Sequence, residues 1–329
     1  MSEAILEPEL PIVDPHHHLW DRRTTAGPGA PPPQHEFDAL LRLSPKYLLD
    51  ELLADIRGAG HNVIATVFVE CSAFWRADGP PDLKVVGETE FVNGVAAMSA
   101  SGLYGEVRAC AGIVGRADFT LGDRVAAQLE AHVAAGGGRF RGVRQSASHD
   151  DDPAVLGPLA RTTAGLYVSD AFRSGFGHLG RMGLSFDAWL LEPQLPDLID
   201  LARAFPDTTI ILDHVGTPLG LGGYAGRRQE RFDVWRDNIR RLAESPKVFV
   251  KVGGLAMPFG GFPGFMSEPP LGSEALAAEW KPYVETCIEA FGPERCMFES
   301  NFPVDRGSCD YATLWNAFKR LAAGASAEE

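Results

Sequence analysis

The chain has 329 residues, of which 45% are hydrophobic and 22% charged, a composition typical of globular enzymes. Its formal net charge of −14 argues against nucleic acid and anionic membrane surfaces as partners, and no apolar run approaches the roughly 18 residues that span a membrane. Five widely spaced cysteines without a Cys-x-x-Cys pair predict reduced thiols in a cytoplasmic protein.

Short β-rich segments recur along the chain, each followed by a candidate helix. The predicted strands cover 12–18, 63–71, 107–114, 140–145, 184–190, 209–214, 248–252 and 296–300. The predicted helices cover 47–57, 85–101, 123–135, 154–162, 171–182, 195–204, 230–244, 274–291 and 311–323. Eight such units predict a single-domain (β/α)8 TIM barrel over residues 1–329 with loop insertions at its C-terminal mouth. The alternative, a doubly wound open sheet, usually has fewer strands and a glycine-rich loop after the first.

The first predicted strand ends in Asp14-Pro15-His16-His17-His18. Because side chains alternate along a strand, His16 and His18 share one face and His17 points the other way. Two neighbouring imidazoles at a strand end can bind one metal ion or one polar substrate. A tag remnant is the alternative, but the histidines lie between Ile-Val-Asp-Pro and Leu-Trp-Asp without linker residues.

Two insertions rich in glycine and proline follow strand ends, at 26–34 and 255–270. In a barrel both would lie over the mouth, where apolar loops suit a lid over an aromatic or otherwise apolar substrate. A packed loop or a contact within a homodimer is the alternative.

Polar residues collect at the C-terminal ends of the predicted strands, where a TIM barrel carries its chemistry. Charged side chains in apolar strands are costly unless they are paired or functional. The strand-end residues are His16, His18, Glu70, Trp75, Arg76, Arg141, Arg144, Gln145, Asp187, Trp189, Asp213, His214, Lys251, Glu299, Asn301 and Asp305. For two of them a structural role is the alternative: Lys251 would pair with a carboxylate of a neighbouring strand, and Asp213 would orient a histidine.

Four segments at these strand ends resemble motifs of the amidohydrolase superfamily, in particular its amidohydrolase-2 group. They are Asp-Pro-His-His-His-Leu-Trp-Asp (14–21), Phe-Arg-Gly-Val-Arg (140–144), Leu-Asp-His-Val-Gly (212–216) and Phe-Glu-Ser-Asn-Phe-Pro (298–303). The resemblance covers nearly the whole chain and is strong because of the order and spacing. It implies a metal-dependent-type TIM-barrel hydrolase similar to 2-pyrone-4,6-dicarboxylate lactonase and sugar-acid lactonases.

The chain departs from the family pattern at Asn301, where the family has an aspartate that serves as general base and often as metal ligand. An amide cannot take a proton at neutral pH and is a weaker ligand than a carboxylate. Glu299 has the same strand parity, and Asp305 lies four residues further on. Strand four offers arginines and no lysine to bridge two metals, so a binuclear site is not expected.

The leading hypothesis is a hydrolase that opens a lactone or similar cyclic ester of a carboxylate-bearing small molecule. Since a guanidinium fork matches a carboxylate, substrate binding is assigned to Arg76, Arg141, Arg144, Trp75 and Trp189. Catalysis is assigned to His16, His18, His214, Glu299, Asn301 and Asp305.

In this hypothesis the three histidines polarise the carbonyl, either directly, without metal, or as ligands of one divalent zinc or manganese ion. Glu299 or Asp305 activates water, and Asn301 orients that water or donates to the oxyanion. One alternative is a mononuclear-metal decarboxylase or hydratase of an aromatic or unsaturated acid. Another is a barrel that binds or scaffolds without catalysis.

Overall fold

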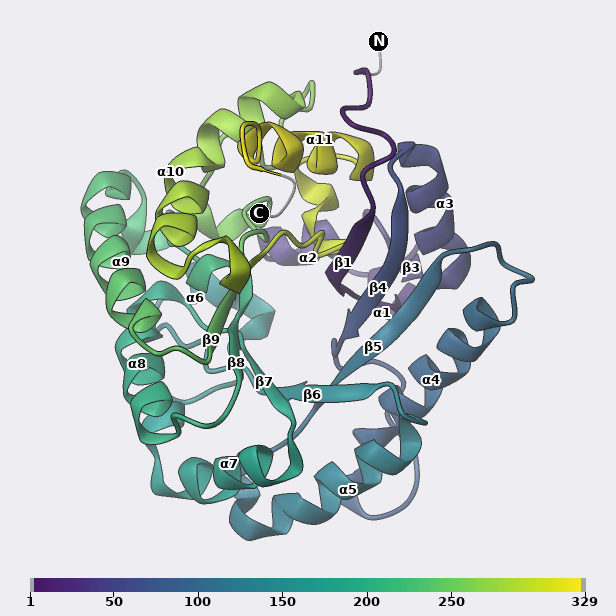
Figure 1. Ribbon diagram of the computed structural model, residues 1–329, viewed down its shortest axis with the longest axis vertical. Helices are drawn as coiled ribbons and strands as arrows, with labels where there is room; N and C mark the ends of the chain where they lie inside the picture. The colour runs from purple at the N-terminus through teal and green to yellow at the C-terminus, as the bar shows by residue number, and fades with distance from the viewer. Residues whose placement is uncertain (1–2, 327–329) are drawn as a thin grey trace.

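The computed structural model describes residues 3–326 and forms a ring of parallel strands surrounded by helices (Figure 1). Eight strands make one sheet in which neighbours in space are also neighbours in sequence. Their bounds are β1 Ile12–His17, β4 Val63–Val69, β5 Arg108–Arg116, β6 Phe140–Arg144, β7 Ser185–Ala188, β8 Ile210–Leu212, β9 Val248–Lys251 and β10 Cys296–Met297. Each neighbouring pair is parallel. The predicted (β/α)8 barrel is therefore confirmed.

Backbone hydrogen bonds of the residues after β10 close the barrel against β1. Asn301 N donates to His16 O, and His18 N donates to Phe302 O, both at 2.8 Å. His17 and Phe302 form a parallel bridge at the same place. The closure therefore brings the histidine segment and Asn301 together, although some 280 residues separate them along the chain.

The buried carboxylate of Asp14 reinforces this closure. Its Oδ1 accepts from Ser300 N at 3.0 Å, and its Oδ2 accepts from the Tyr311 hydroxyl at 2.9 Å. One side chain thus connects β1, the segment after β10 and the last helix.

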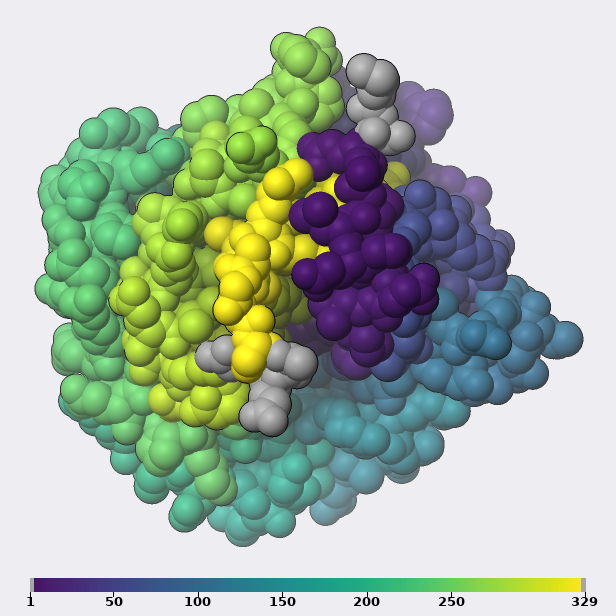
Figure 2. Space-filling model, turned by 45° about the horizontal axis from the view of Figure 1, so that its top comes forward, coloured from purple at the N-terminus to yellow at the C-terminus, as the bar shows by residue number. Residues whose placement is uncertain are grey.

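The longer helices lie outside the ring (Figure 1). They are α3 Leu49–Ala59, α4 Val86–Ala100, α5 Val125–Ala135, α7 Asp170–Met182, α8 Leu195–Ala204, α9 Arg228–Ala243, α10 Ser273–Phe291 and α11 Tyr311–Leu321. The N-terminal segment lies beside the C-terminal part of the chain (Figure 2), where Lys319 Nζ donates to Leu6 O at 2.8 Å. Among the described residues, no helix combines the length and apolar character needed to cross a membrane.

Helix α7 shows why the helices bury one face. Phe172, Phe176 and Leu179 recur at helical spacing and are fully buried, and both phenylalanines contact Phe186 of β7. Ser169 caps the helix by accepting from Phe172 N.

The prediction of a helix over 154–162 is wrong beyond Leu156. Helix α6 covers only Pro153–Leu156, and a single 3-10 turn, Gly157–Leu159, follows it. Gly157 has a φ of 48°, and Pro158 has no N–H to continue a helix. The residues from 158 onward instead form part of the wall of the mouth.

Four short elements near the first strand were not predicted from the sequence. They are β2 Trp20–Asp21, α1 Arg23–Ala26, α2 Glu36–Leu41 and β3 Lys46–Tyr47. Strands β2 and β3 pair antiparallel. Elements of two to six residues are too short to show a hydrophobic period.

Candidate active site

A pocket of about 410 Å³ opens at the C-terminal ends of the strands. Its lining includes His18, Glu70, Arg144, Trp189, His214 and Asn301, which come from six different strand ends. The long insertions also contribute, because Met257 and, just after the first insertion, Phe37 line the same pocket. The sequence predicted that the polar strand-end residues and both insertions lie at the C-terminal mouth of the barrel, and the pocket agrees with that prediction.

Three histidines lie together at the floor of this pocket. The ring centroid of His16 is 4.9 Å from that of His18 and 4.7 Å from that of His214. His17 turns away, and its Nε2 lies 2.8 Å from the Thr66 hydroxyl. The predicted alternation of the three consecutive histidines is therefore confirmed.

Glu299 orients His214. Its Oε1 lies 2.7 Å from His214 Nδ1 and accepts from His214 N at 3.2 Å. His214 has a φ of 55°, and a Cβ at Gly254 would lie 2.2 Å from its Nδ1, so the ring needs a glycine beside it. The pairing with Nδ1 leaves Nε2 as the ring nitrogen available to the pocket.

His16 lies deeper and contacts carboxylates. Its Nδ1 is 2.7 Å from Glu299 Oε2 and 3.7 Å from Asp213 Oδ1. Burial, and after it the positive charge of Lys251, hold the pKa of His16 well below its usual value. This environment favours the neutral form of the His16 imidazole.

Lys251 connects two acidic strand ends. Its Nζ donates to Asp187 Oδ2 at 2.5 Å and lies 3.0 Å from Asp213 Oδ1. Burial raises the pKa of Asp187 to about 6. Burial also acts against ionisation of Asp213, but Lys251 and His214 outweigh it and hold the pKa of Asp213 at about 2. The contact that the sequence predicted between Lys251 and a carboxylate of the neighbouring strand end is present, with Asp213.

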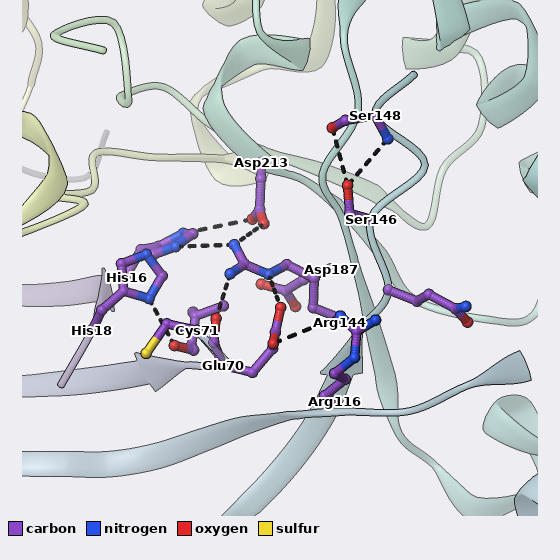
Figure 3. Close-up of polar contacts among 12 residues, drawn as sticks. His16, His18, Glu70, Cys71, Arg116, Arg144, Ser146, Ser148, Asp187 and Asp213 are labelled. Carbon is purple, nitrogen blue, oxygen red and sulfur yellow. Dashed lines mark hydrogen bonds and ion pairs between the residues drawn. The ribbon is translucent and has the colours of Figure 1, made fainter. Parts of the chain in front are cut away.

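Arg144 is held between two carboxylates (Figure 3). Its Nε donates to Glu70 Oε1 at 3.0 Å, and its Nη1 donates to Asp213 Oδ2 at 3.3 Å. The guanidinium lies 5.8 Å from the centre of the Trp189 ring. Arg144 lines the pocket as predicted, but most of its donors are already used within the protein.

Asp305 lies behind Asn301 and does not line the pocket. Its Oδ1 accepts from Asn301 Nδ2 at 2.7 Å, and burial holds its pKa well above the usual value. His18 Nε2 lies 3.3 Å from Asn301 Oδ1, while His18 Nδ1 donates to Val69 O at 2.8 Å. The expectation that Asp305 activates water directly is therefore corrected: it is a buried acid that contacts the pocket only through Asn301.

Two predicted substrate-binding arginines lie away from the pocket. Arg76 forms a solvent-exposed ion pair with Glu90. Arg141 is the second residue of β6, is exposed and donates to Gly138 O at 2.8 Å, near the N-terminal end of the strand. Strand parity turns Arg141 outward, three residues before Arg144. Both assignments are corrected, whereas the predicted Trp75 and Trp189 do line the pocket.

Sequence reasoning missed three pocket arginines: Arg22, Arg116 and Arg161. Arg116 ends β5, and the strand-end rule would have found it if that strand had been extended two residues past 114. Arg22 directly follows the histidine motif, whereas Arg161 lies in the segment wrongly predicted as helix.

One group of side chains fits a cation. Ligand atoms of His16, Asp213 and His214 lie within 4.8 Å of one another. The carboxylate oxygens here contact a lysine and a histidine: Asp213 Oδ1 lies 3.0 Å from Lys251 Nζ, and Glu299 Oε2 lies 2.7 Å from His16 Nδ1. This network contains two permanent cations, Arg144 and Lys251. Its carboxylates outnumber them and are Glu70, Asp187, Asp213 and Glu299. This donor set differs from the predicted one, because Asp213 takes the place of His18.

The barrel thus carries a buried ring of histidines and carboxylates at the C-terminal ends of its strands. Residues 13–329 match the family model described as Amidohydrolase. The chain therefore belongs to the amidohydrolase family, as the sequence motifs predicted, and this membership supports a hydrolase.

Similar proteins cover most of the chain. It is 34% identical to the uncharacterized protein y4mH of Sinorhizobium fredii over 98% of the chain and 94% of that protein. It is 28% identical to an L-fucono-1,5-lactonase of Burkholderia ambifaria over 89% of the chain and 81% of that protein. A solved amidohydrolase from Burkholderia multivorans with bound zinc shares the fold at 24% identity, with a TM-score of 0.67 over 96% of this chain and 93% of that one.

Proposed function

We propose that the protein hydrolyses a lactone or similar cyclic ester of a carboxylate-bearing small molecule. One observation carries the proposal: His214, whose Nδ1 lies 2.7 Å from the buried Glu299 carboxylate, lines the same pocket as Asn301 and Arg144. A histidine oriented by a carboxylate beside polar donors is an arrangement suited to water-driven acyl transfer. The L-fucono-1,5-lactonase relative supports the same reaction class.

In this mechanism His214 exchanges protons with water and the leaving group. Its Nδ1–H donates to Glu299, so Nε2 accepts the proton of a water as that water's oxygen attacks the lactone carbonyl. When the ring C–O bond breaks, the imidazolium returns this proton to the alkoxide. Glu299 is fully buried and therefore acts through His214, which revises the expectation that it activates water itself.

Two further groups stabilise the charge that develops on the carbonyl oxygen. Arg144 lines the pocket from β6, and Asn301 lines it from the segment after β10. Both side chains carry N–H donors, and both are held in place by partners before substrate arrives: Arg144 by Glu70 and Asn301 by Asp305. Donors fixed in advance cost no reorganisation when the oxyanion forms.

In a metal-dependent form of this mechanism, His16, Asp213 and His214 would hold a divalent cation, zinc or manganese, and His214 would then be a ligand instead of the base. A bound divalent cation polarises a carbonyl and lowers the pKa of bound water. The zinc in the Burkholderia multivorans amidohydrolase supports this part of the proposal.

The test combines a lactone panel with metal analysis. Ring opening is followed by acid release on carboxylate-bearing lactones, with protein purified gently and then treated with a chelator. Activity lost on chelation and restored by zinc or manganese supports the metal-dependent form, in which His214 is a ligand. Unchanged activity without metal supports the form in which His214 is the base. Carbon dioxide release from hydroxybenzoates, without lactone opening, would instead favour a decarboxylase.

A further inference from the structure

The charge of the pocket is opposite to that of the protein. The whole chain carries −14, yet the pocket is lined by four arginines and only two carboxylates. The arginines are Arg22, Arg116, Arg144 and Arg161, and the carboxylates are Asp38 and Glu70. A local excess of positive charge in an acidic protein attracts an anion specifically to this place.

Arg144 and Glu70 neutralise each other at the floor of the pocket. The Arg144 guanidinium donates to both Oε1 and the backbone oxygen of Glu70. The other carboxylate oxygen, Oε2, reaches one of the remaining arginines, Arg116, through a long ion pair of 3.9 Å. These three, Arg22, Arg116 and Arg161, together form what we call the outer wall of the pocket.

Arg22 offers a buried donor without a partner. Its Nη2 donates to Cys71 O at 2.7 Å, and its guanidinium lies 5.2 Å from the centre of the Trp20 ring. Among the described residues, its buried Nε has no hydrogen-bond partner. Leaving a charged donor buried and unpaired is costly, so a ligand that accepts from Nε gains affinity there.

Arg116 and Arg161 are also without a close carboxylate. Arg116 lies 5.9 Å from the centre of the Trp75 ring, and its one ion pair, with Glu70, is long at 3.9 Å (Figure 3). Arg161 is exposed and has no hydrogen-bond or ion-pair partner within residues 3–326. Three guanidinium groups with spare donors thus face one cavity.

We infer that the outer wall is a second anion subsite, and that the substrate carries an anionic group there in addition to its carbonyl end at His214. This inference deepens the proposed function: the substrate is an acidic lactone with one or two carboxylates rather than a neutral polyhydroxy lactone. The lining holds four arginines against two carboxylates, Glu70 and Asp38, and this excess of positive charge favours an anionic substrate over a neutral one. Guanidinium forks and flanking tryptophans fit a planar acidic ring.

The experiment measures binding and needs no turnover. Isophthalate and benzoate serve as planar probes with two carboxylates and one, and isothermal titration gives their affinities for the full-length protein at low and moderate salt. Wild-type protein should bind isophthalate about 10-fold more tightly than benzoate, the effect of one added charge-assisted contact. Arg22→Gln and Arg161→Gln should each remove most of this preference.

The two variants guard against misfolding in different ways. Arg161 is exposed and unpaired, so Arg161→Gln leaves the fold intact even if Arg22→Gln disturbs β2. Arg203→Gln is the matched control, because Arg203 pairs with Glu244 on the surface and does not line the pocket. Equal affinity of wild type for both probes, or equal weakening by the control, overturns the inference.

The outcome is separable from that of the proposed function. Isophthalate preference without lactone opening supports the subsite and contradicts the lactonase. Opening of neutral sugar lactones, without preference for isophthalate, supports the lactonase and contradicts the subsite.

Discussion

The floor and the outer wall of the pocket differ in how firmly their side chains are held. At the floor, His16, Asp213, Lys251 and Glu299 are between 0% and 2% exposed, and each contacts at least two of the others or their neighbours. At the outer wall, Arg161 is exposed, and Trp75, which Arg116 contacts, is 43% exposed. The comparison teaches that reactive groups are fixed by one another, whereas recognition groups keep donors free for a ligand.

The two regions should therefore respond differently to substitution. At the floor, removing one side chain leaves its partner as an unpaired buried charge or leaves a histidine without its orienting contact, so both the hydrolysis rate and the free energy of unfolding should fall. At the outer wall, removing an arginine should lower the affinity for an anionic ligand and leave the free energy of unfolding nearly unchanged. Four substitutions follow in order of expected effect: two at the floor, one in a buried residue beside the pocket and one outside the pocket.

The largest effect is expected for Glu299→Gln. The amide can no longer hold both His16 and His214, each of which lies 2.7 Å from the carboxylate. Loss of a carboxylate that orients a catalytic histidine lowers kcat by about a thousandfold or more. Steady-state lactone hydrolysis measures this, with Glu294→Gln as a control on the exposed turn before β10. A rate near wild type would remove Glu299 from the mechanism.

Next comes Lys251→Met, which leaves Asp187 and Asp213 buried without their shared cation. Breaking a buried ion pair from one side costs about 3–5 kcal/mol, measurable by urea unfolding. The exposed Lys281→Met, which breaks a surface pair with Glu285, should cost less than ~1 kcal/mol. Adding Asp187→Asn to Lys251→Met should restore part of the loss; no recovery would show that Lys251 acts through packing alone.

A pH-dependent effect of intermediate size is expected at Glu88, which supports the loop below the pocket by accepting from Cys71 N and Ala73 N, both at 3.0 Å. Burial, with the charge of Glu70, raises the pKa of Glu88 from 4.5 to about 7. A folded state that binds the proton more tightly gains stability below pH 4.5 and loses it as pH rises through 7.

This loss should amount to roughly 3 kcal/mol between pH 4.5 and pH 7.5. Glu88→Gln keeps an acceptor for both N–H groups but cannot ionise, so its unfolding free energy should change less over that range. Urea unfolding at several pH values compares wild type, this variant and the exposed Glu130→Gln. Parallel curves for wild type and Glu88→Gln would contradict the assignment.

The smallest effect is expected for Arg76→Gln, because the Arg76–Glu90 pair is exposed and outside the pocket. Exposed pairs contribute about 0–1 kcal/mol, so unfolding free energy and KM should both stay near wild type. A tenfold rise in KM would return Arg76 to the substrate site, as the sequence alone suggested.

The expectation that functional side chains lie at the C-terminal strand ends was correct where the direction of a side chain follows from its alternation along the strand. His16 and His18 on one face, Glu299 facing inward and Lys251 paired with a neighbouring strand all follow from position along a strand. The expectation failed at Arg141, one of two arginines in the same strand, because the motif was read without its parity.

Failures elsewhere had a different cause. Arg76 belongs to a loop and Asp305 to the short 3-10 helix Val304–Gly307, and neither has a period that predicts side-chain direction. Burial behind Asn301 decided the position of Asp305. The outer wall was missed because its arginines come from β5, from the turn after β2 and from the irregular crossover before α7. The cytoplasmic location and the homodimer stay predictions.

The sequence by itself determined the barrel, the end of the barrel that carries the site and the family. These depend on local periodicity and on motif order, which the chain carries in one dimension. Only the tertiary structure decided which charged side chains pair with one another and which keep donors available to a ligand. That decision depends on burial and on contacts such as Asp213 with Lys251, or Glu70 with Arg144, between residues distant along the chain.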